Sequence, residues 1–263
     1  MAYTNSSLVS YTKLSPNHSG QRTHSIDRIT PHCVVGQLTA ESICGCFTSP
    51  SREASCNYGI GKDGKIALCV EEKNRSWCSS SSANDQRAVT IECASDLNHP
   101  YAMTTAVYNS LVKLCTDICK RNGKKKLLWL GDKNKTLNYS PKSDEMVLTV
   151  HRWFANKSCP GDWLYSRLGD LASKVTAALG GSSSGSATSA LYRVRKNWSD
   201  AKSQKGAFNN LDNAKRCADS NAGYSVYDES GKVVYTGKQT GSGSSTGSFL
   251  VQVTATDLNI RKG

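Results

Sequence analysis

The chain has 263 residues, enough for one full globular domain and a smaller module. The formal net charge is +12 and is shared: residues 1–179 carry 22 Lys and Arg against 15 Asp and Glu (+7), and residues 180–263 carry 11 against 6 (+5). Both parts therefore attract polyanions at long range. The sequence contains no run of about eighteen apolar residues, which excludes insertion into a membrane. The N-terminus also lacks the basic and apolar regions of a cleaved export signal.

The eleven cysteines are odd in number and contain no C-x-x-C pair. This pattern excludes a zinc ribbon and a thioredoxin-type redox site. Without an export signal, the cysteines are expected to be mostly reduced thiols that pack as small hydrophobes. Four of them are assigned to packing: Cys33, Cys93, Cys115 and Cys119.

Short apolar or alternating runs predict the strands of the first segment, at residues 28–35, 55–61, 65–71, 88–94 and 127–130. Asp63-Gly64 predicts a hairpin turn between the second and third of these. Helices are predicted after Thr39, over residues 104–122 with Gly123 as the stop, and over residues 163–179. We expect an α/β fold in which one mixed central sheet is flanked by helices.

Two Gly/Ser-rich stretches, residues 180–189 and 238–248, have the composition of flexible linkers. They separate a first domain at residues 1–179, a small module at 190–237 and a stub at 249–263. The module predicts a strand, a helix and a hairpin, with little core of its own. The stub begins with an apolar strand that has no partner, so the natural protein is expected to continue past residue 263.

Two of the five histidines end apolar runs: His32 ends residues 28–32, and His151 ends residues 146–151. Cys159 follows eight residues after His151. Two imidazoles and one thiolate would make a three-ligand zinc site, the number of protein ligands that is typical of catalytic zinc. The fourth position would hold a water whose pKa falls to about 7. The spacing alone is equally compatible with three structural residues.

The run HRWFANKSCPG at residues 151–161 resembles the C-terminal metal motif of the type 2 N-acetylmuramoyl-L-alanine amidases, which include phage amidase lysozymes and peptidoglycan recognition proteins. The run ITPH at 29–32 resembles the first-ligand strand of that family, and residues 55–64 resemble its central hairpin. Trp77 and residues 88–92 resemble the stretch that follows. The resemblance spans about residues 14–179, and its details are similar to clostridial autolysins and prophage endolysins.

This resemblance implies that His32, His151 and Cys159 bind Zn²⁺, with a zinc-bound water as the nucleophile that cuts the bond between N-acetylmuramic acid and L-alanine. It implies that Lys157 stabilises the oxyanion and that Glu92 acts as general base or acid. From the residues alone, Lys157 reads equally as a surface lysine and Glu92 as a solvent-facing strand residue.

One position departs from the family pattern. The phage lysozymes carry a catalytic tyrosine two residues before the aromatic of the central strand, which is Tyr58 here, and Cys56 occupies that earlier position. A thiol does not reproduce the hydrogen bond of a phenol, so Glu92 is the favoured base. Tyr58 is assigned to core packing, although strand alternation places it on the same face as Cys56.

Three other functions would each require sequence features that differ from those of a zinc amidase. A non-catalytic recognition protein would lack a ligand, whereas all three positions are filled. A muramidase needs two facing carboxylates, and the adjacent Glu71 and Glu72 face opposite ways. A nucleic-acid binder would have aromatic residues among its basic ones, and residues 120–126 have none.

The expected partners are therefore bacterial peptidoglycan and anionic wall polymers, with neither nucleic acid nor membrane insertion. The protein is expected to be made in the cytoplasm and to reach the wall through a holin or through lysis. Residues 190–237 loosely resemble the sporulation-related repeats that attach enzymes to the wall. Residues 249–263 resemble the start of a bacterial SH3-type wall-binding domain.

Overall fold

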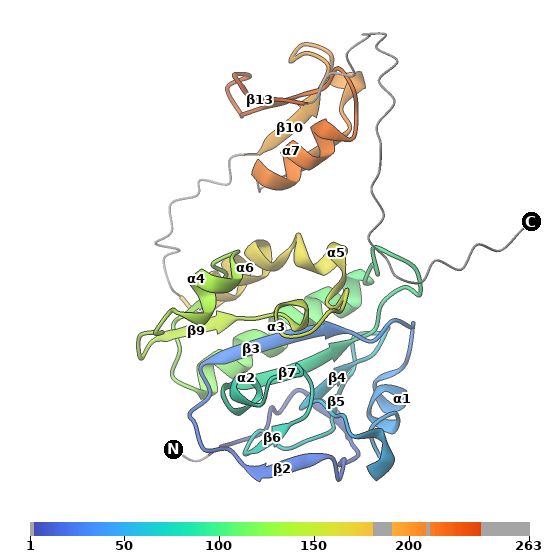
Figure 1. Ribbon diagram of the computed structural model, residues 1–263, viewed down its shortest axis with the longest axis vertical. Helices are drawn as coiled ribbons and strands as arrows, with labels where there is room; N and C mark the ends of the chain where they lie inside the picture. Colours follow the sequence, from blue (N-terminus) through green and yellow to red (C-terminus); the bar gives the residue numbers. More distant parts are fainter. Residues whose placement is uncertain (1–2, 181–190, 209–210, 238–263) are drawn as a thin grey trace, which may run out of the picture. The chain divides into compact units, whose positions relative to one another are not determined.

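The computed structural model describes residues 3–180, 191–208 and 211–237, and the chain divides after Ala190 into two compact units. The first unit is built on a seven-stranded sheet with the order β1-β5-β4-β7-β3-β9-β8 (Figure 1). In that order its strands are β1 (Val9–Thr12), β5 (Ile66–Leu68), β4 (Tyr58–Ile60), β7 (Ala88–Cys93), β3 (Arg28–Cys33), β9 (Glu145–Leu148) and β8 (Lys126–Leu128).

The sheet is mixed, as predicted. Strands β4, β7, β3, β9 and β8 run parallel, β5 is antiparallel to β4, and β1 is parallel to β5. The predicted turn connects β4 to β5, and its Gly64 has φ +85°, where a Cβ would lie 2.9 Å from the carbonyl oxygen of Ala106. The turn therefore requires glycine. The parallel strands bring the carboxyl ends of β3 and β7 to the same edge, and this edge carries the candidate site.

Helices lie on both sides of the sheet. In Figure 1, α3 lies behind the sheet and α2 in front of it, and α3 also packs against α6. The helices of this unit are α1 (Ala40–Gly45), α2 (Ser82–Arg87), α3 (Thr105–Arg121), α4 (Lys133–Leu137), α5 (Gly161–Tyr165) and α6 (Leu168–Ala178), with 3-10 turns η1 (Pro50–Arg52) and η2 (His151–Trp153).

The long helix α3 confirms the prediction for residues 104–122. The Thr104 side chain accepts a hydrogen bond from the Val107 amide at the start, and Gly123 follows the end with φ +67°. Five residues spaced at helical intervals are fully buried on its inner face: Val107, Leu111, Leu114, Cys115 and Ile118.

The prediction of one helix over residues 163–179 is wrong, because the chain forms α5 and α6 with a break at Ser166 and Arg167. The break leaves a helix carbonyl without its backbone partner, and nearby side chains donate hydrogen bonds to it. The carbonyl oxygen of Trp163 accepts from the Arg167 guanidinium at 2.9 Å and from the Ser166 hydroxyl at 3.0 Å. The apolar residues at helical spacing are nevertheless fully buried along both helices: Leu164, Leu168, Leu171 and Val175.

Several elements were not predicted: β1, α2, α4, and a two-stranded sheet of β2 (His18–Gln21) and β6 (Asn74–Ser76). The cysteines also differ in part from expectation. Cys44 of α1 and Cys69 after β5 form a disulfide, because the helix packs directly over that strand. The other nine cysteines are free thiols.

The second unit has its own sheet, with the order β11-β10-β12-β13, and one helix, α7 (Leu211–Asp219). The strands are β10 (Tyr192–Arg195), β11 (Gly206–Phe208), β12 (Ser225–Tyr227) and β13 (Val233–Thr236), and a 3-10 turn η3 (Ala201–Ser203) precedes β11. The predicted strand, helix and hairpin are present, and β11 is additional. The core consists of five buried side chains: Val194, Ala214, Ala218, Tyr224 and Val226. The role of this unit in wall attachment stays a prediction.

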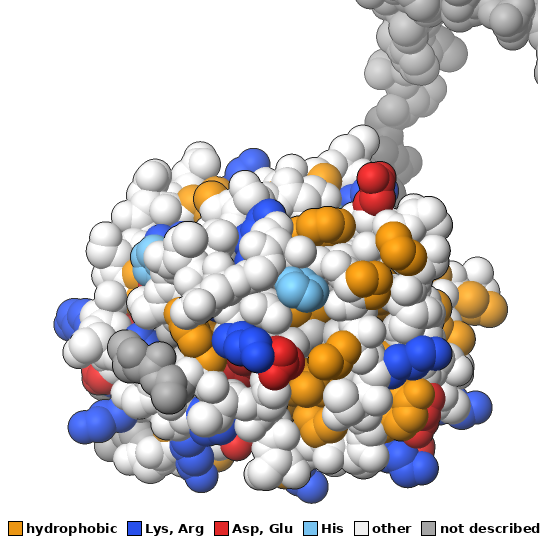
Figure 2. All heavy atoms as spheres, turned by 90° about the horizontal axis from the view of Figure 1, so that it is seen from below, with side chains coloured by type: hydrophobic (Ala, Val, Ile, Leu, Met, Phe, Trp, Pro, Cys, Tyr) orange, Lys and Arg blue, Asp and Glu red, His pale blue; other side chains and the backbone are white. Residues whose placement is uncertain are grey.

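The predictions for residues 238–248 and 249–263, and for nearly all of 180–189, concern segments outside the described residues. Within the described parts of the chain, no helix has both the length and the apolar character needed to cross a membrane. Figure 2 shows Lys and Arg side chains spread over one face among acidic and apolar ones, in agreement with the even distribution of charge along the sequence.

Candidate active site

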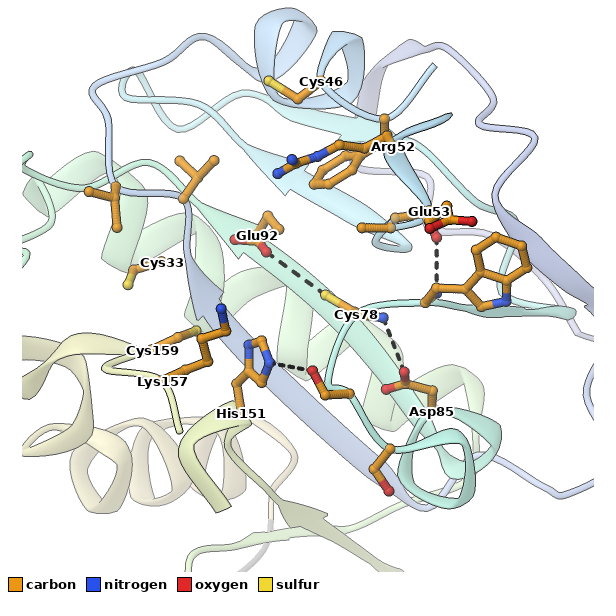
Figure 3. A pocket seen from close by; sticks show the side chains of 18 of the residues that line it. Cys33, Cys46, Arg52, Glu53, Cys78, Asp85, Glu92, His151, Lys157 and Cys159 are labelled. Carbon is orange, nitrogen blue, oxygen red and sulfur yellow. Dashed lines mark hydrogen bonds between the residues drawn. The ribbon is translucent and has the colours of Figure 1, made fainter. Parts of the chain in front are cut away.

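A cleft with a volume of about 870 Å³ opens where β3 and β7 end. Its lining combines basic, acidic, thiol and apolar side chains, of which Figure 3 shows the central ones. The lining includes Cys33, Val35, Arg52, Glu53, Trp77, Cys78, Ser80, Glu92, Tyr101, His151, Lys157 and Cys159.

Three residues far apart in the sequence meet beside this cleft. His32 lies near the end of β3 and is 1% exposed, His151 begins η2, and Cys159 lies in the loop before α5. The Cys159 sulfur is 3.2 Å from Nδ1 of His32, and the His32 and His151 ring centres are 5.1 Å apart. One ligand atom from each of the three lies within 4.8 Å of the others, so the group could hold one metal ion.

The apolar run that ends at His151 is a strand only in its first part. Strand β9 ends at Leu148, although the Thr149 amide still bonds to the Ile29 carbonyl at 3.0 Å, and His151 then starts a 3-10 turn. The turn brings the ring back over the edge of the sheet.

Burial keeps both imidazoles neutral. It lowers the pKa of His32 to about 3, with a further contribution from His151, and it also lowers the pKa of His151, to which the charge of Lys157 adds. Neutral imidazole is the form that binds metal. Contact with the Cys33 thiol, followed by burial, raises the pKa of Cys159, so a metal would have to displace a proton there.

Glu92 lies on β7 in register with His32 on β3, and its side chain is 14% exposed. Its Oε1 is 3.9 Å from Nδ1 of His32 and 3.9 Å from the Cys78 sulfur. Burial raises the pKa of Glu92 to about 7, against the opposing effects of the Cys78 contact and the Arg52 charge. Because His32 is neutral above pH 5, this contact is not an ion pair at neutral pH.

Two buried polar atoms at the site have no partner among the described residues, Nε2 of His32 and Oε2 of Glu92. Buried polar groups are almost always satisfied, so two orphan atoms in one place indicate a missing ligand or solvent. Lys157, the other predicted catalytic residue, is exposed and lines the cleft beside His151 (Figure 3).

A buried network braces the segments that carry these residues. The Asn84 amide on α2 donates to the Thr30 hydroxyl at 3.0 Å, and its oxygen accepts from the Thr149 hydroxyl at 3.0 Å. The two threonine hydroxyls are 2.7 Å apart. Since Thr149 has given its proton to Asn84, Thr30 donates to Thr149. Thr30 precedes His32 by two residues and Thr149 precedes His151 by two, so the network fixes both histidines.

The loop with Cys159 is fixed from within. The Arg152 amide donates to the Cys159 carbonyl at 3.1 Å, and the Arg152 guanidinium donates to the Ser158 carbonyl and, at 2.9 Å, to Asp162. The arginine thus closes the segment between the two candidate ligands His151 and Cys159.

Cys33 is buried in the core cluster, as predicted, but it also reaches the site. Its thiol contacts Cys159 and lines the cleft, because the chain leaves the regular strand at Cys33 and turns at Val35, which has φ +52°. Cys93, Cys115 and Cys119 are buried in the core, as predicted. Cys78 and Ser80 lie in a polar loop that no periodicity marks, and Arg152 lies in η2, inside the run 151–161, where no pattern indicates its hydrogen bonds.

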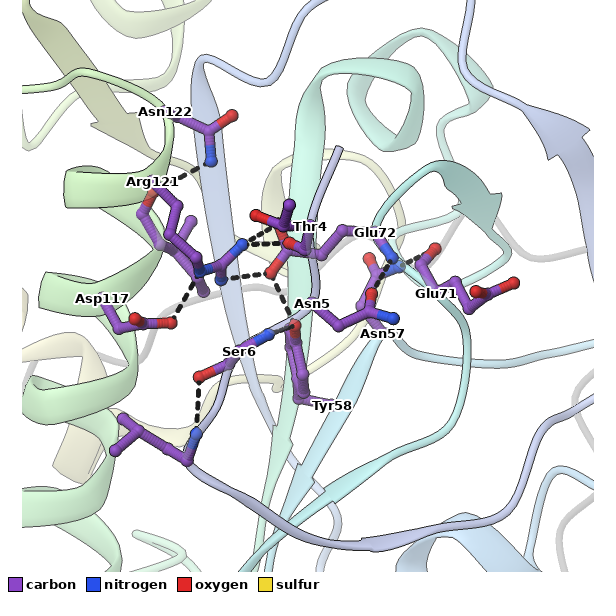
Figure 4. Close-up of polar contacts among 12 residues, drawn as sticks. Thr4, Asn5, Ser6, Asn57, Tyr58, Glu71, Glu72, Asp117, Arg121 and Asn122 are labelled. Atoms are coloured by element: carbon purple, nitrogen blue, oxygen red, sulfur yellow. Dashed lines mark hydrogen bonds and ion pairs between the residues drawn. The ribbon is translucent and has the colours of Figure 1, made fainter. Parts of the chain in front are cut away.

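Tyr58 is fully buried, as predicted, and its hydroxyl belongs to a separate polar network (Figure 4). The hydroxyl donates to Glu72 at 2.6 Å and accepts from the Ser6 amide at 2.9 Å. Glu72 also pairs with Arg121 of α3 at 2.6 Å, and Arg121 bonds to the Thr4 carbonyl. The network ties the N-terminal segment to α3, and none of its members lines the cleft.

Glu71 and Glu72 face opposite ways, as expected. Glu72 is buried against Arg121, whereas Glu71 pairs with Lys73 at 2.8 Å near the surface. Cys56, which stands in place of the tyrosine of the phage lysozymes, is fully buried. Burial and the nearby Glu92 charge raise the pKa of its thiol.

The mixed sheet carries, at one edge, a cleft with a candidate His/Cys metal site. A family model described as N-acetylmuramoyl-L-alanine amidase matches residues 22–162, more than half of the chain, and the chain belongs to this family. It is therefore an N-acetylmuramoyl-L-alanine amidase that acts on peptidoglycan.

Several solved structures are similar. A selenomethionine derivative of AmpD is 17% identical, covering 65% of this chain and 99% of its own, with a TM-score of 0.46. An endolysin amidase from Clostridium intestinale URNW is 15% identical, covering 66% and 98%, with a TM-score of 0.38. The Ph2119 endolysin from the Thermus scotoductus MAT2119 bacteriophage is 14% identical, covering 62% and 89%, with a TM-score of 0.41. No curated protein matches the sequence.

Tyr58→Phe is expected to lower the free energy of unfolding by about 1–2 kcal/mol, because it leaves a buried carboxylate and a buried amide with one partner fewer. The rate of peptidoglycan hydrolysis should be unchanged, since the hydroxyl does not reach the cleft. Urea unfolding and turbidity decrease of purified walls measure the two effects. A folded variant with little activity would show that Tyr58 takes part in catalysis.

Glu92→Gln should stabilise the metal-free protein more as the pH rises. The folded pKa of about 7 lies above the ordinary 4.5, so this group favours folding fully below pH 4.5 and loses that contribution as the pH rises through 7. The variant has no carboxyl group to ionise, so it avoids this loss of up to about 3 kcal/mol in the free energy of unfolding. Urea unfolding in EDTA at pH 5 and pH 8 tests it, with Glu53→Gln, an exposed carboxylate of the same cleft, as the control. An equal effect at both pH values would contradict the buried-carboxyl account.

Proposed function

We propose that the enzyme hydrolyses the amide bond between N-acetylmuramic acid and L-alanine with a zinc ion held by His32, His151 and Cys159. The observation that carries the proposal is the convergence of one ligand atom from each residue within 4.8 Å. The donor set fits the metal, because zinc in catalytic sites has three protein ligands drawn from imidazole, thiolate and carboxylate. When bound, zinc supplies Lewis acidity and lowers the pKa of coordinated water.

Glu92 is the proposed general base and acid. It receives a proton from the attacking water and passes it to the leaving amine. Its place on β7, in register with His32 on β3, supports this role. Cys56 offers no alternative, since its thiol is buried and its pKa is raised.

Lys157 is proposed to stabilise the oxyanion. It lines the cleft beside His151, and its charge lowers the pKa of that imidazole, so the cation lies close to the candidate metal group. A fixed cation favours the transition state because negative charge develops on that oxygen only there.

Purified protein is expected to contain about one zinc per chain, and Cys159→Ser should lose it, because a serine hydroxyl is a poor zinc ligand. Cys78→Ser is the matched control. Cys78 belongs to a second possible metal group, with His32 and Glu92, that shares one histidine with the first. Metal content by atomic emission and the N-terminal residue of released peptides are the readouts. Zinc retained in Cys159→Ser but lost in Cys78→Ser would assign the metal to the second group, and a metal-free active enzyme would refute both.

Glu92→Gln should lower kcat by about a hundredfold while zinc stays bound, the usual scale for loss of acid–base catalysis. Because the base must be ionised, the wild-type rate should rise with pH, and the variant should lose this rise. Lys157→Met should also lower kcat with zinc retained but keep the pH dependence, since it removes a charge rather than the base. Hydrolysis of soluble muropeptides between pH 5 and pH 9 measures both. A fully active Glu92→Gln enzyme would refute the proposed base.

A further inference from the structure

The chain contains a serine at the rim of the cleft whose backbone conformation is costly. Ser80 has φ +62°, in the left-handed region that side chains other than glycine rarely occupy. Among the described residues, four that are not glycine have a positive φ: Val35, Glu53, Ser80 and Tyr101. All four line the cleft. Such strain persists where surrounding contacts impose it, and it concentrates at functional sites.

The contacts that impose the conformation of Ser80 come from α2. The Asp85 carboxylate accepts from the backbone amides of Cys78 at 3.0 Å and Ser79 at 3.1 Å. The Ser79 hydroxyl accepts from Asn84 at 3.2 Å, and the Ser81 hydroxyl caps the helix by accepting from the Asn84 amide at 3.3 Å. Both neighbours of Ser80 are therefore tied to α2, and the residue between them is turned outward.

The outward turn places the Ser80 hydroxyl 2.9 Å from Nε2 of His151 (Figure 3). The other ring nitrogen, Nδ1, remains for the metal group. In a neutral imidazole one nitrogen carries the proton and the other carries the lone pair. If the Ser80 oxygen accepts from Nε2–H, Nδ1 is left with its lone pair directed toward Cys159 and His32. The distal nitrogen of His32 has no such partner among the described residues.

We propose that Ser80 is a positioning residue that fixes the tautomer and the ring orientation of His151 for metal binding. The inference rests on the proposed function, since it assumes that His151 is a ligand. Groups that hold the distal nitrogen of a ligating histidine orient the ring and raise its basicity, and their loss costs about 10- to 100-fold in metal affinity. Ser80 does this from a strained loop rather than from a carboxylate.

Two neighbouring serines allow a sharp test because their variants should behave in opposite ways. Ser80→Gly relieves the left-handed strain, so the metal-free variant should unfold at a higher urea concentration than wild type. It should nevertheless bind zinc about 10- to 100-fold more weakly in competition with a chromophoric chelator. Ser79→Ala breaks the bond to Asn84 and should unfold earlier, and its zinc affinity should fall less than that of Ser80→Gly, because the Ser80 hydroxyl is kept. Glu53→Gly relieves strain at a second left-handed position without touching a ligand and should leave zinc affinity unchanged.

A spectroscopic readout separates positioning from a merely structural role. In the zinc-loaded wild type, nitrogen NMR of the His151 ring should show a proton on Nε2 that exchanges slowly with water. This signal should disappear or exchange much faster in Ser80→Ala, which removes the hydroxyl and keeps a side chain. Equal zinc affinity in Ser80→Gly and wild type, or an unchanged Nε2 proton in Ser80→Ala, would overturn the inference alone. A wild-type protein that binds no zinc would overturn it together with the proposed function.

Discussion

The geometry of the site depends on one buried side-chain amide, that of Asn84. All of its hydrogen-bonding capacity is used: its two N–H groups reach Thr30 and Ser79, and its oxygen accepts from Thr149 and Arg28. The four partners lie in three segments: Arg28 and Thr30 in β3, Ser79 in the loop before α2, and Thr149 just after β9. A fully satisfied polar group in a dry interior tolerates little displacement, because any lost bond leaves a buried donor or acceptor unpaired. Asn84 therefore sets where His32, His151 and Ser80 stand relative to one another.

The cleft and the core of the domain are separated by the sheet. On the cleft side, Glu92 and the candidate ligands lie at the ends of parallel strands, where side chains are only partly packed. On the α3 side, Tyr58, Glu72 and Arg121 form an equally polar but closed network that serves the attachment of the N-terminal segment. Two buried carboxylates thus have different fates. Glu72 pairs with the cation Arg121. Glu92 accepts a weak hydrogen bond from the Cys78 thiol, and its pKa is raised to about 7.

The sequence was sufficient for elements with strong periodicity or a specific turn signal, such as α3 and the hairpin at Asp63-Gly64. It did not reveal the break between α5 and α6, because neither Ser166 nor Arg167 is a helix breaker and their side chains satisfy the freed carbonyl of Trp163. The strands β1, β2 and β6 are short, polar or half exposed, and their partners lie far away in the chain. At the site, the motifs indicated His32, His151, Cys159, Glu92 and Lys157, and all five lie at or beside one cleft. Ser80 could not be found in this way, since its orientation follows from the bonds that Asp85 makes to its neighbours.

The Arg152 loop has a consequence for engineering. Its bonds to the carbonyls of Ser158 and Cys159, and to Asp162, are all internal to one stretch of twelve residues, 151–162, so the spacing of His151 and Cys159 is set by the stretch itself. Outside the stretch, Ser80 contacts His151 and His99 contacts Asp162, so these two residues would be kept in any exchange. Exchanging the stretch as a block between related enzymes would vary two donor groups and the neighbouring lysine together while His32 stays anchored in β3, and the chemistry of the cleft could be altered without redesigning the sheet.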